Sequence, residues 1–211
     1  MDKPAPTDIS TADYWSARYR AGQTGWDTRG VNRGLVDLVL AHSSPRDRVL
    51  IPGAGSGYEA EELLRRGYRE VYVCDWAAEA FAGMRASPVL AEAFPDPAER
   101  ARHFLVGDFF GLEGSYDVLV EQTFFCAIDP ARRGDYVAQA ARLLRPGGLV
   151  VGLLFDRAFP APGPPFGGDR DAYAARFATH FEIERLGAFA HSIPSRQGTE
   201  LALVARRKAE L

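Results

Sequence analysis

The sequence predicts an α/β protein built on one open, mostly parallel sheet. Five short apolar runs alternate with amphipathic, helix-like runs, a pattern typical of parallel strands joined by crossover helices. A glycine-rich segment follows the first of these strands and opens a helix, at the position where open α/β sheets bind ligands. The last two apolar runs leave no room for a crossover helix, so we expect them to pair antiparallel at one edge of the sheet.

The individual elements are separated by capping residues, glycines and prolines. Thr11 is a possible N-cap of the first helix, and Gly67 ends the helix that follows the first strand. Asp96 and Pro97 interrupt the chain before the third strand, and the Pro-rich stretch 160–168 is expected to be a loop. The turn Arg145-Pro146-Gly147-Gly148 is expected to separate a helix from the fifth strand. The expected helices cover about 11–21, 31–41, 58–67, a segment beginning at 77, 132–145 and 169–178. The expected strands are RVLIP, EVYVCD, HFLVGD, YDVLVEQ, LVVGLLF, FEIERLGAFA and GTELALVARR.

The composition limits the classes of function. The 211 residues suit one domain, and 46% hydrophobic residues can form a sizeable core. With 25 basic and 28 acidic side chains the formal charge is -3, so we expect no general attraction to nucleic acid or to an anionic membrane. No apolar run approaches the roughly 18 residues that span a bilayer, and the polar start MDKPAPTDIS lacks the apolar core of a secretion signal.

The two cysteines and four histidines carry no structural framework. Cys74 and Cys126 both lie in apolar contexts, and two thiols make neither a disulfide framework nor a metal knuckle. We therefore expect a cytoplasmic protein. The histidines lack metal-ligand spacing, so no metal is expected, and Cys126 is interpreted as a small packing residue.

The glycine-rich segment PGAGSGYE, with Gly53, Gly55 and Gly57, indicates a nucleoside site. Glycine lets the backbone approach a ligand closely, but Tyr58 stands where a dinucleotide fingerprint needs its third glycine, and the loop carries no cation for a pyrophosphate. Asp75 ends the second strand, where a carboxylate can accept from both hydroxyls of a ribose. Asp108 follows the third strand, where it could accept from an adenine amino group. These features favour an adenosine without phosphates, and S-adenosylmethionine is the leading candidate.

Several longer motifs resemble one known family. They are YW…RY…G…GWD, PGAGSGYE, GDFF, EQTFFCAIDP, PGPPF and HSIPSRQGTE. Together they resemble the thiopurine methyltransferase family of class I S-adenosylmethionine-dependent methyltransferases, and most of all its branch of thiol and halide methyltransferases. The likeness covers about residues 13–205. It implies a Rossmann-like, seven-stranded sheet with an antiparallel C-terminal edge strand and helices on both faces. We expect one domain over 1–211, with an N-terminal lid (1–42) over the core (43–211).

The resemblance implies cofactor contacts at matched positions. Trp15 and Trp26 would cover the methionine end, where Glu121 and Thr123 would also lie. Asp75 would hold the ribose. The full set of expected cofactor residues is Trp15, Trp26, Pro52, Gly53, Gly55, Gly57, Asp75, Trp76, Asp108, Phe109, Glu121 and Thr123. Two positions depart from the family: Glu121-Gln122 stands where thiopurine-specific members carry Asp-Arg, and Gly30 falls one residue later than in the branch.

The expected chemistry needs alignment more than acid–base catalysis. Methyl transfer from a sulfonium is an in-line displacement that requires positioning and exclusion of water. A thiolate or halide arrives charged, so no catalytic general base is assigned. Aromatic side chains can enclose the methyl group and stabilise a sulfonium; the candidates are Tyr19, Trp26, Phe124, Phe125 and Phe166. The hypothesis for the acceptor site names Tyr19, Phe124, Phe125, Tyr173 and Arg196, with Arg196 attracting the anion.

The sequence therefore predicts an enzyme that methylates a small soft nucleophile and releases S-adenosylhomocysteine. Two alternatives within the enzyme class are a thiopurine-type enzyme for larger heteroaromatic thiols and a small-molecule O- or N-methyltransferase. Outside that class, a catalytically silent S-adenosylmethionine-binding sensor stays open. The expected partner is a small-molecule acceptor, without nucleic acid or membrane, and the chain is expected to be a monomer or weak homodimer.

Overall fold

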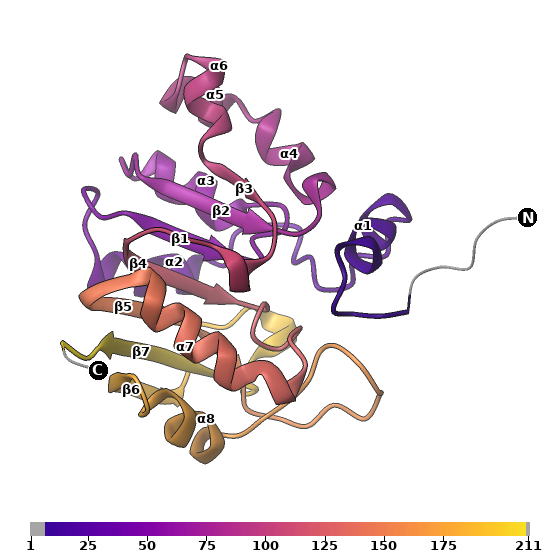
Figure 1. The fold of residues 1–211 in the computed structure, drawn as a ribbon, viewed down its shortest axis with the longest axis vertical. Helices are drawn as coiled ribbons and strands as arrows, with labels where there is room; N and C mark the ends of the chain where they lie inside the picture. Colours follow the sequence, from indigo (N-terminus) through magenta and orange to yellow (C-terminus); the bar gives the residue numbers. More distant parts are fainter. Residues whose placement is uncertain (1–6, 210–211) are drawn as a thin grey trace, which may run out of the picture.

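A seven-stranded sheet organises the chain in a computed structural model that describes residues 7–209 (Figure 1). The strand order is β3-β2-β1-β4-β5-β7-β6. The first five strands pair parallel, and β7 pairs antiparallel with both β5 and β6. The expected fold class is confirmed, with β7 inserted beside β5 so that β6 forms the edge. The strands are β1 (Val49–Pro52), β2 (Val71–Asp75), β3 (Phe104–Val106), β4 (Tyr116–Gln122), β5 (Leu144–Phe155), β6 (Phe181–Ala188) and β7 (Glu200–Arg207).

Helices cover both faces of this sheet (Figure 1). The α-helices are α1 (Ala12–Arg20), α2 (Arg33–His42), α3 (Tyr58–Arg65), α4 (Ala82–Arg85), α5 (Pro88–Ala93), α6 (Pro97–Ala101), α7 (Arg133–Leu143) and α8 (Arg170–Phe177). Short 3-10 turns are η1 (Ala78–Phe81), η2 (Phe109–Gly111), η3 (Pro130–Arg132) and η4 (Pro194–Arg196). Side chains alternate between two cores along each strand: Val49 and Ile51 pack with α2 and α3, whereas Leu50 packs with α7 and α8.

Two expected segments differ in the structure. The helix expected from residue 77 is divided into η1, α4, α5 and α6, because Ser87-Pro88 and Asp96-Pro97 each start a new helix. The Ser87 and Asp96 side chains accept from the backbone N–H groups of Val89 and Ala98, and proline stands at the first helical position of each. The expected turn at 145–148 is instead assigned to β5, which starts at Leu144, and the register beside β4 shifts there.

The Pro-rich stretch 160–168 is a loop, as expected. Between residues 7 and 209, no helix has both the length and the apolar character needed to cross a membrane. The sequence-based interpretation of residues 1–6 and of the last two residues concerns segments outside those that the structure describes.

Candidate active site

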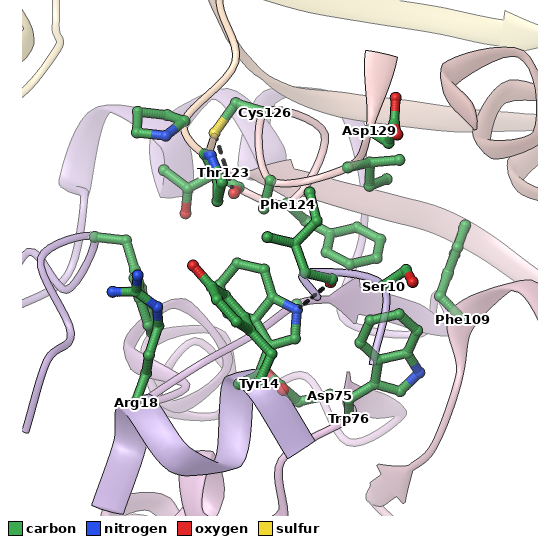
Figure 2. Close-up of a pocket in the computed structure, with 18 of the residues that line it drawn as sticks. Ser10, Tyr14, Arg18, Asp75, Trp76, Phe109, Thr123, Phe124, Cys126 and Asp129 are labelled. Carbon is green, nitrogen blue, oxygen red and sulfur yellow. Dashed lines mark hydrogen bonds between the residues drawn. The ribbon is translucent and has the colours of Figure 1, made fainter. Parts of the chain in front are cut away.

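A cavity of about 510 Å³ opens at the carboxyl ends of the parallel strands. Its walls come from α1 and the segments before and after it, from the ends of β1, β2 and β4, from the loop before η2, from the Pro-rich loop and from η4. In Figure 2, Asp75 and Trp76 lie across the cavity from Thr123 and Cys126, and Tyr14 of α1 lies between them. The parallel order brings these strand ends to one edge of the sheet, where ligands of such folds bind.

The β1–α3 loop contributes less of the wall than expected. Gly53 lines the cavity with a φ of 58°, and a Cβ there would collide with the Phe124 ring. Pro52, Gly55 and Gly57 do not line the cavity. Gly57 serves packing instead, because a Cβ there would lie 2.6 Å from the Met84 sulfur at a φ of 74°.

Asp75 is held in place by the backbone and faces the cavity. Its Oδ2 accepts from the N–H of Gly55 at 3.3 Å, and its Oδ1 accepts from the N–H of Ala77 at 3.0 Å. Burial raises the pKa of Asp75 to about 6, although these backbone N–H groups oppose the rise. No basic side chain among residues 7–209 forms an ion pair with Asp75. The oxygens therefore retain the capacity to accept from a diol.

The end of β3 adds a second acceptor beside aromatic rings. Asp108 Oδ1 accepts from the N–H of Phe110 at 3.0 Å and caps η2, so its other oxygen is free to face a ligand. Trp76, Phe109 and Asp108 all line the cavity. The Phe109 ring is fixed from behind by the Tyr136 ring, at a centroid distance of 5.3 Å. Two aromatic rings and a carboxylate that can accept from an amino group thus line the same part of the cavity.

The N-terminal segment closes over the cavity through three aromatic residues. Trp15 and Tyr19 both meet Trp26 edge to face, at centroid distances of 5.4 and 5.5 Å, and all three line the cavity. Ser56 Oγ donates to Asp27 Oδ2 at 3.0 Å and ties this segment to the β1–α3 loop. The segment therefore forms a wall of the cavity.

The turn after β4 sends neighbouring side chains in different directions. Thr123, at the strained φ of 60°, and Phe124 line the cavity. Phe125 is 1% exposed and packs edge to face on Tyr136 and Tyr173 in the core. Its expected place in the acceptor site is thus wrong, because the tight turn directs it behind the wall.

Glu121 and Tyr173 also lie outside this cavity. Glu121 is fully buried and accepts from the N–H groups of Phe124 (3.0 Å) and Phe125 (2.8 Å) and from the Tyr136 hydroxyl (2.7 Å). It shapes the turn instead of lining the wall, and burial raises its pKa to about 7. Tyr173 is 2% exposed and donates to the carbonyl oxygen of Phe155 at 2.7 Å.

Phe166 is likewise absent from the wall. Its N–H donates to the carbonyl oxygen of Cys126 at 2.6 Å, and its own carbonyl oxygen accepts from Arg133. These contacts anchor the Pro-rich loop to the turn after β4. The expectation that its ring encloses the acceptor is wrong, because the residue holds the loop from outside the cavity.

Arg196 lies at the cavity wall, and its side chain is only 12% exposed. It donates from Nη2 to the carbonyl oxygen of Trp26 at 3.3 Å, and its Nη1 lies 3.5 Å from Glu200 Oε1. Its guanidinium carbon lies 5.3 Å from the centroid of the Phe155 ring. One cation thus joins the N-terminal segment to η4 beside the cavity.

Sequence reasoning missed several wall residues. They are Ile9, Ser10, Tyr14, Arg18, Phe110, Cys126, Ile128, Asp129, Arg132, Phe155, Arg157, Phe159, Pro164, Pro165, Ser195 and Thr199. The PGPPF motif was a signal for the prolines, and the YW…RY motif contains Tyr14 and Arg18, although neither was given a role. Cys126 donates from Sγ to the carbonyl oxygen of Thr123 at 3.2 Å, and burial raises its pKa to about 12, so the thiol stays protonated at neutral pH.

Comparison with known families gives a match over nearly the whole chain. The family model described as Thiopurine S-methyltransferase (TPMT) matches residues 10–208. A probable thiol methyltransferase 2 of Arabidopsis thaliana is 30% identical over 154 residues, which cover 72% of this chain and 66% of the relative. Thiocyanate methyltransferase 1 of the same plant is 25% identical over 207 residues, covering 93% and 88% of the two chains. A thiopurine S-methyltransferase of Methylococcus capsulatus is 27% identical over 190 residues, covering 83% and 85%.

Solved structures agree on the fold. The 1,6-didemethyltoxoflavin-N1-methyltransferase of Burkholderia thailandensis, solved with S-adenosylhomocysteine, has a TM-score of 0.73 at 21% identity and covers 99% of this chain and 93% of its own. The magnesium protoporphyrin IX methyltransferase of Synechocystis, solved with S-adenosylmethionine, has a TM-score of 0.64 at 16% identity, covering 96% and 86% of the two chains.

Proposed function

Because the chain belongs to the thiopurine S-methyltransferase family and is an S-adenosylmethionine-dependent S-methyltransferase, we propose that it methylates a small soft nucleophile. The acceptor is a thiol, hydrosulfide, thiocyanate or halide. The single observation that carries this proposal is the aromatic wall of the cavity with Arg196 set into it. The printed names of two plant relatives, a probable thiol methyltransferase and a thiocyanate methyltransferase, support the same acceptor class.

The residues present fit S-adenosylmethionine. The Asp75 carboxylate, with no cation bound to it among the described residues, suits two ribose hydroxyls and disfavours a phosphate. Asp108, Trp76 and Phe109 would hold the adenine, and Trp15 would cover the opposite end with Trp26. When bound, the cofactor supplies an electrophilic methyl group on a sulfonium.

The acceptor half of the cavity would work by orientation and desolvation. Tyr19, Phe124 and Phe155 present aromatic surface to the space, which excludes water and leaves a soft anion poorly solvated and more nucleophilic. Arg196 would attract the anion, and its contacts with Glu200 and with the Trp26 carbonyl oxygen would hold the guanidinium in place at the cavity wall. The roles of the acceptor residues are thus binding and alignment.

A heteroaromatic thiol is the second candidate. Bacterial relatives named thiopurine S-methyltransferase match 83% of the chain, and the loop residues Phe159, Pro164 and Pro165 offer apolar area for a ring. Against it, Glu121 is buried behind the turn after β4 and offers no polar contact to a purine.

A labelled-methyl assay separates these candidates. Purified protein is incubated with methyl-labelled S-adenosylmethionine and with iodide, thiocyanate, hydrosulfide, thiophenol, mercaptopurine, phenol or aniline, and volatile products are detected in the headspace. We expect turnover of the small sulfur and halide acceptors. Turnover of mercaptopurine alone supports the second candidate, and turnover of phenol or aniline alone supports O- or N-methylation. Tight binding of S-adenosylhomocysteine with no turnover of any acceptor supports a silent sensor.

A further inference from the structure

A second, very small cavity lies behind the wall of the main one. Its volume is about 10 Å³, roughly the space that one water molecule requires. Thr123, Cys126 and Phe155 line both cavities, so these residues form a shared partition. Tyr173 and Glu200 complete the polar lining on the far side. The small cavity therefore lies between the carboxyl group of Glu200 and the residues that it shares with the main cavity.

Glu200 begins β7 and is 4% exposed. Its Oε1 lies 3.5 Å from Arg196 Nη1, but its buried Oε2 has no hydrogen-bond partner among residues 7–209. A buried carboxylate oxygen without a donor is costly, and one water in the small cavity would supply the donor. The Tyr173 hydroxyl already donates to Phe155, so it can accept from the same water.

We propose that Glu200 takes up the thiol proton when the methyl acceptor arrives as a neutral thiol. This inference rests on the function proposed above. The S–H bond of the thiol breaks and its electron pair stays on sulfur. In the structure the Thr123 hydroxyl donates to the carbonyl oxygen of Gln122 at 2.7 Å, so the relay requires this hydroxyl to rotate toward the small cavity. The thiol proton then passes to the Thr123 hydroxyl oxygen, the Thr123 hydroxyl proton passes to the water in the small cavity, and a water proton passes to Glu200 Oε2. One thiol becomes a thiolate, one carboxylate becomes a carboxylic acid, and Glu200 returns the proton to solvent after product release.

The groups around Glu200 leave it as the acceptor in this relay. Burial raises the pKa of Glu200 above the usual range, whereas the Ser192 hydroxyl and, to a smaller extent, Arg196 oppose that rise. Burial raises the pKa of Cys126 and of Tyr173 to about 12, so neither takes up or loses a proton near neutrality. Glu121, behind Cys126, also has a raised pKa, but its oxygens are occupied by three donors and it lines neither cavity. Ser192 beside Glu200 is neutral.

The variant Glu200→Gln tests the relay, because it keeps the shape and an oxygen for Arg196 but cannot take a proton. Iodide and an acidic arenethiol such as pentafluorothiophenol are already ionised at pH 7, whereas 2-mercaptoethanol is mostly protonated. We expect turnover of 2-mercaptoethanol to fall about 100-fold at pH 7, and the loss to shrink as the pH rises past the thiol pKa. Turnover of the ionised acceptors by the same variant at pH 7 should differ from that of wild type by less than about twofold. Glu182→Gln, an exposed change on β6 away from both cavities, is the matched control.

Each outcome decides a different question. If Glu200→Gln lowers the turnover of ionised and protonated acceptors equally, the inference is overturned and Glu200 only supports Arg196. The inference is also overturned if the variant lowers the turnover of neither kind of acceptor. A wild-type protein that methylates none of these acceptors contradicts the proposed function instead. If wild type does not use iodide, the ionised arenethiol takes its place in the comparison.

A binding measurement on the wild-type protein does not depend on the variant folding. Thiophenol is added to the complex with S-adenosylhomocysteine below the pKa of the thiol, and the absorbance of the thiolate and the heat in two buffers of different ionisation enthalpy are recorded. We expect a bound thiolate with no proton released to the buffer. Binding as the neutral thiol, or release of one proton per bound thiolate, would overturn the inference.

Discussion

Two carboxylates near the ends of parallel strands, the half-buried Asp75 and the fully buried Glu121, have opposite roles. Asp75 ends β2, lines the cavity and accepts from the backbone N–H groups of Gly55 and Ala77. Glu121, near the end of β4, does not line the cavity and accepts from the turn that follows it and from Tyr136. Asp75 therefore keeps hydrogen-bonding capacity for a ligand, whereas the oxygens of Glu121 are already used by hydrogen bonds within the fold.

A carboxylate at the end of a strand can therefore bind a ligand only where the surrounding backbone leaves its oxygens open. Asp75 accepts from the N–H of Ala77, two residues after β2 ends, and from the N–H of Gly55 in the loop between β1 and α3. After β4 the tight turn at Thr123, with a φ of 60°, folds two N–H groups back onto Glu121. Removing Asp75 should therefore affect binding, and removing Glu121 should affect stability.

The largest expected effect is on stability in Glu121→Ala. The change leaves two buried N–H groups and the Tyr136 hydroxyl without an acceptor, so the free energy of unfolding should fall by about 3 kcal/mol. Urea unfolding of the free protein measures it. Glu121→Gln, which keeps one acceptor oxygen, should lose less. Unchanged stability together with lost cofactor affinity would reverse the assignment of the two carboxylates.

Asp75→Asn should show the opposite pattern. Hydrogen bonds to a charged acceptor contribute about 1.5–3 kcal/mol each, so the affinity for S-adenosylhomocysteine should fall about 100-fold. The free energy of unfolding of the free protein should stay the same or rise, because a partly buried charge is removed. Calorimetric titration and urea unfolding together check both parts, and an unchanged affinity would remove Asp75 from the cofactor site.

The pH dependence should separate the two groups further. Burial raises the pKa of Asp75 to about 6, above the usual 3.8, so its contribution to the stability of the free protein is present below about pH 4 and is lost as the pH rises through 6. Binding has the opposite sign, because the cofactor needs the ionised form: affinity should fall up to about tenfold per pH unit below 6.

Glu121, with a pKa of about 7, should affect stability in the same direction as the pH rises through 7, and should leave cofactor affinity unchanged. Melting temperatures and affinities from pH 4.5 to 7.5 in wild type, Asp75→Asn and Glu121→Gln measure these differences. A pH-dependent affinity that persists in Asp75→Asn would show that another group controls binding.

The smallest effect is expected at two adjacent phenylalanines. Phe124→Leu changes the cavity wall and should raise the KM of the acceptor about three- to tenfold with little change in stability. Phe125→Leu changes the core and should lower the free energy of unfolding by about 1 kcal/mol with an unchanged KM. Steady-state kinetics and urea unfolding measure both effects in both variants. A raised KM in Phe125→Leu together with a lowered free energy of unfolding in Phe124→Leu would contradict the turn geometry.

The part of the cavity proposed for the acceptor was harder to predict than the part proposed for the cofactor. Gly53, Asp75, Trp76 and Asp108 follow strand ends that parallel order brings to one edge, so their proximity follows from local pattern and topology. The acceptor half combines α1, the turn after β4, the Pro-rich loop and η4, which no local pattern brings together. Phe125, the misplaced residue next to Phe124, shows the limit of such reasoning.

The α/β class, the strand-end carboxylate Asp75 and the open glycine at 53 could be predicted from local residues, because backbone periodicity and positive φ depend on nearby residues. The internal position of Glu121, and the contact of Arg196 with the carbonyl oxygen of Trp26, 170 residues away in the chain, became visible only in the folded chain. The physical reason is that the direction of a side chain at a tight turn, and contacts between distant loops, depend on how the whole chain packs.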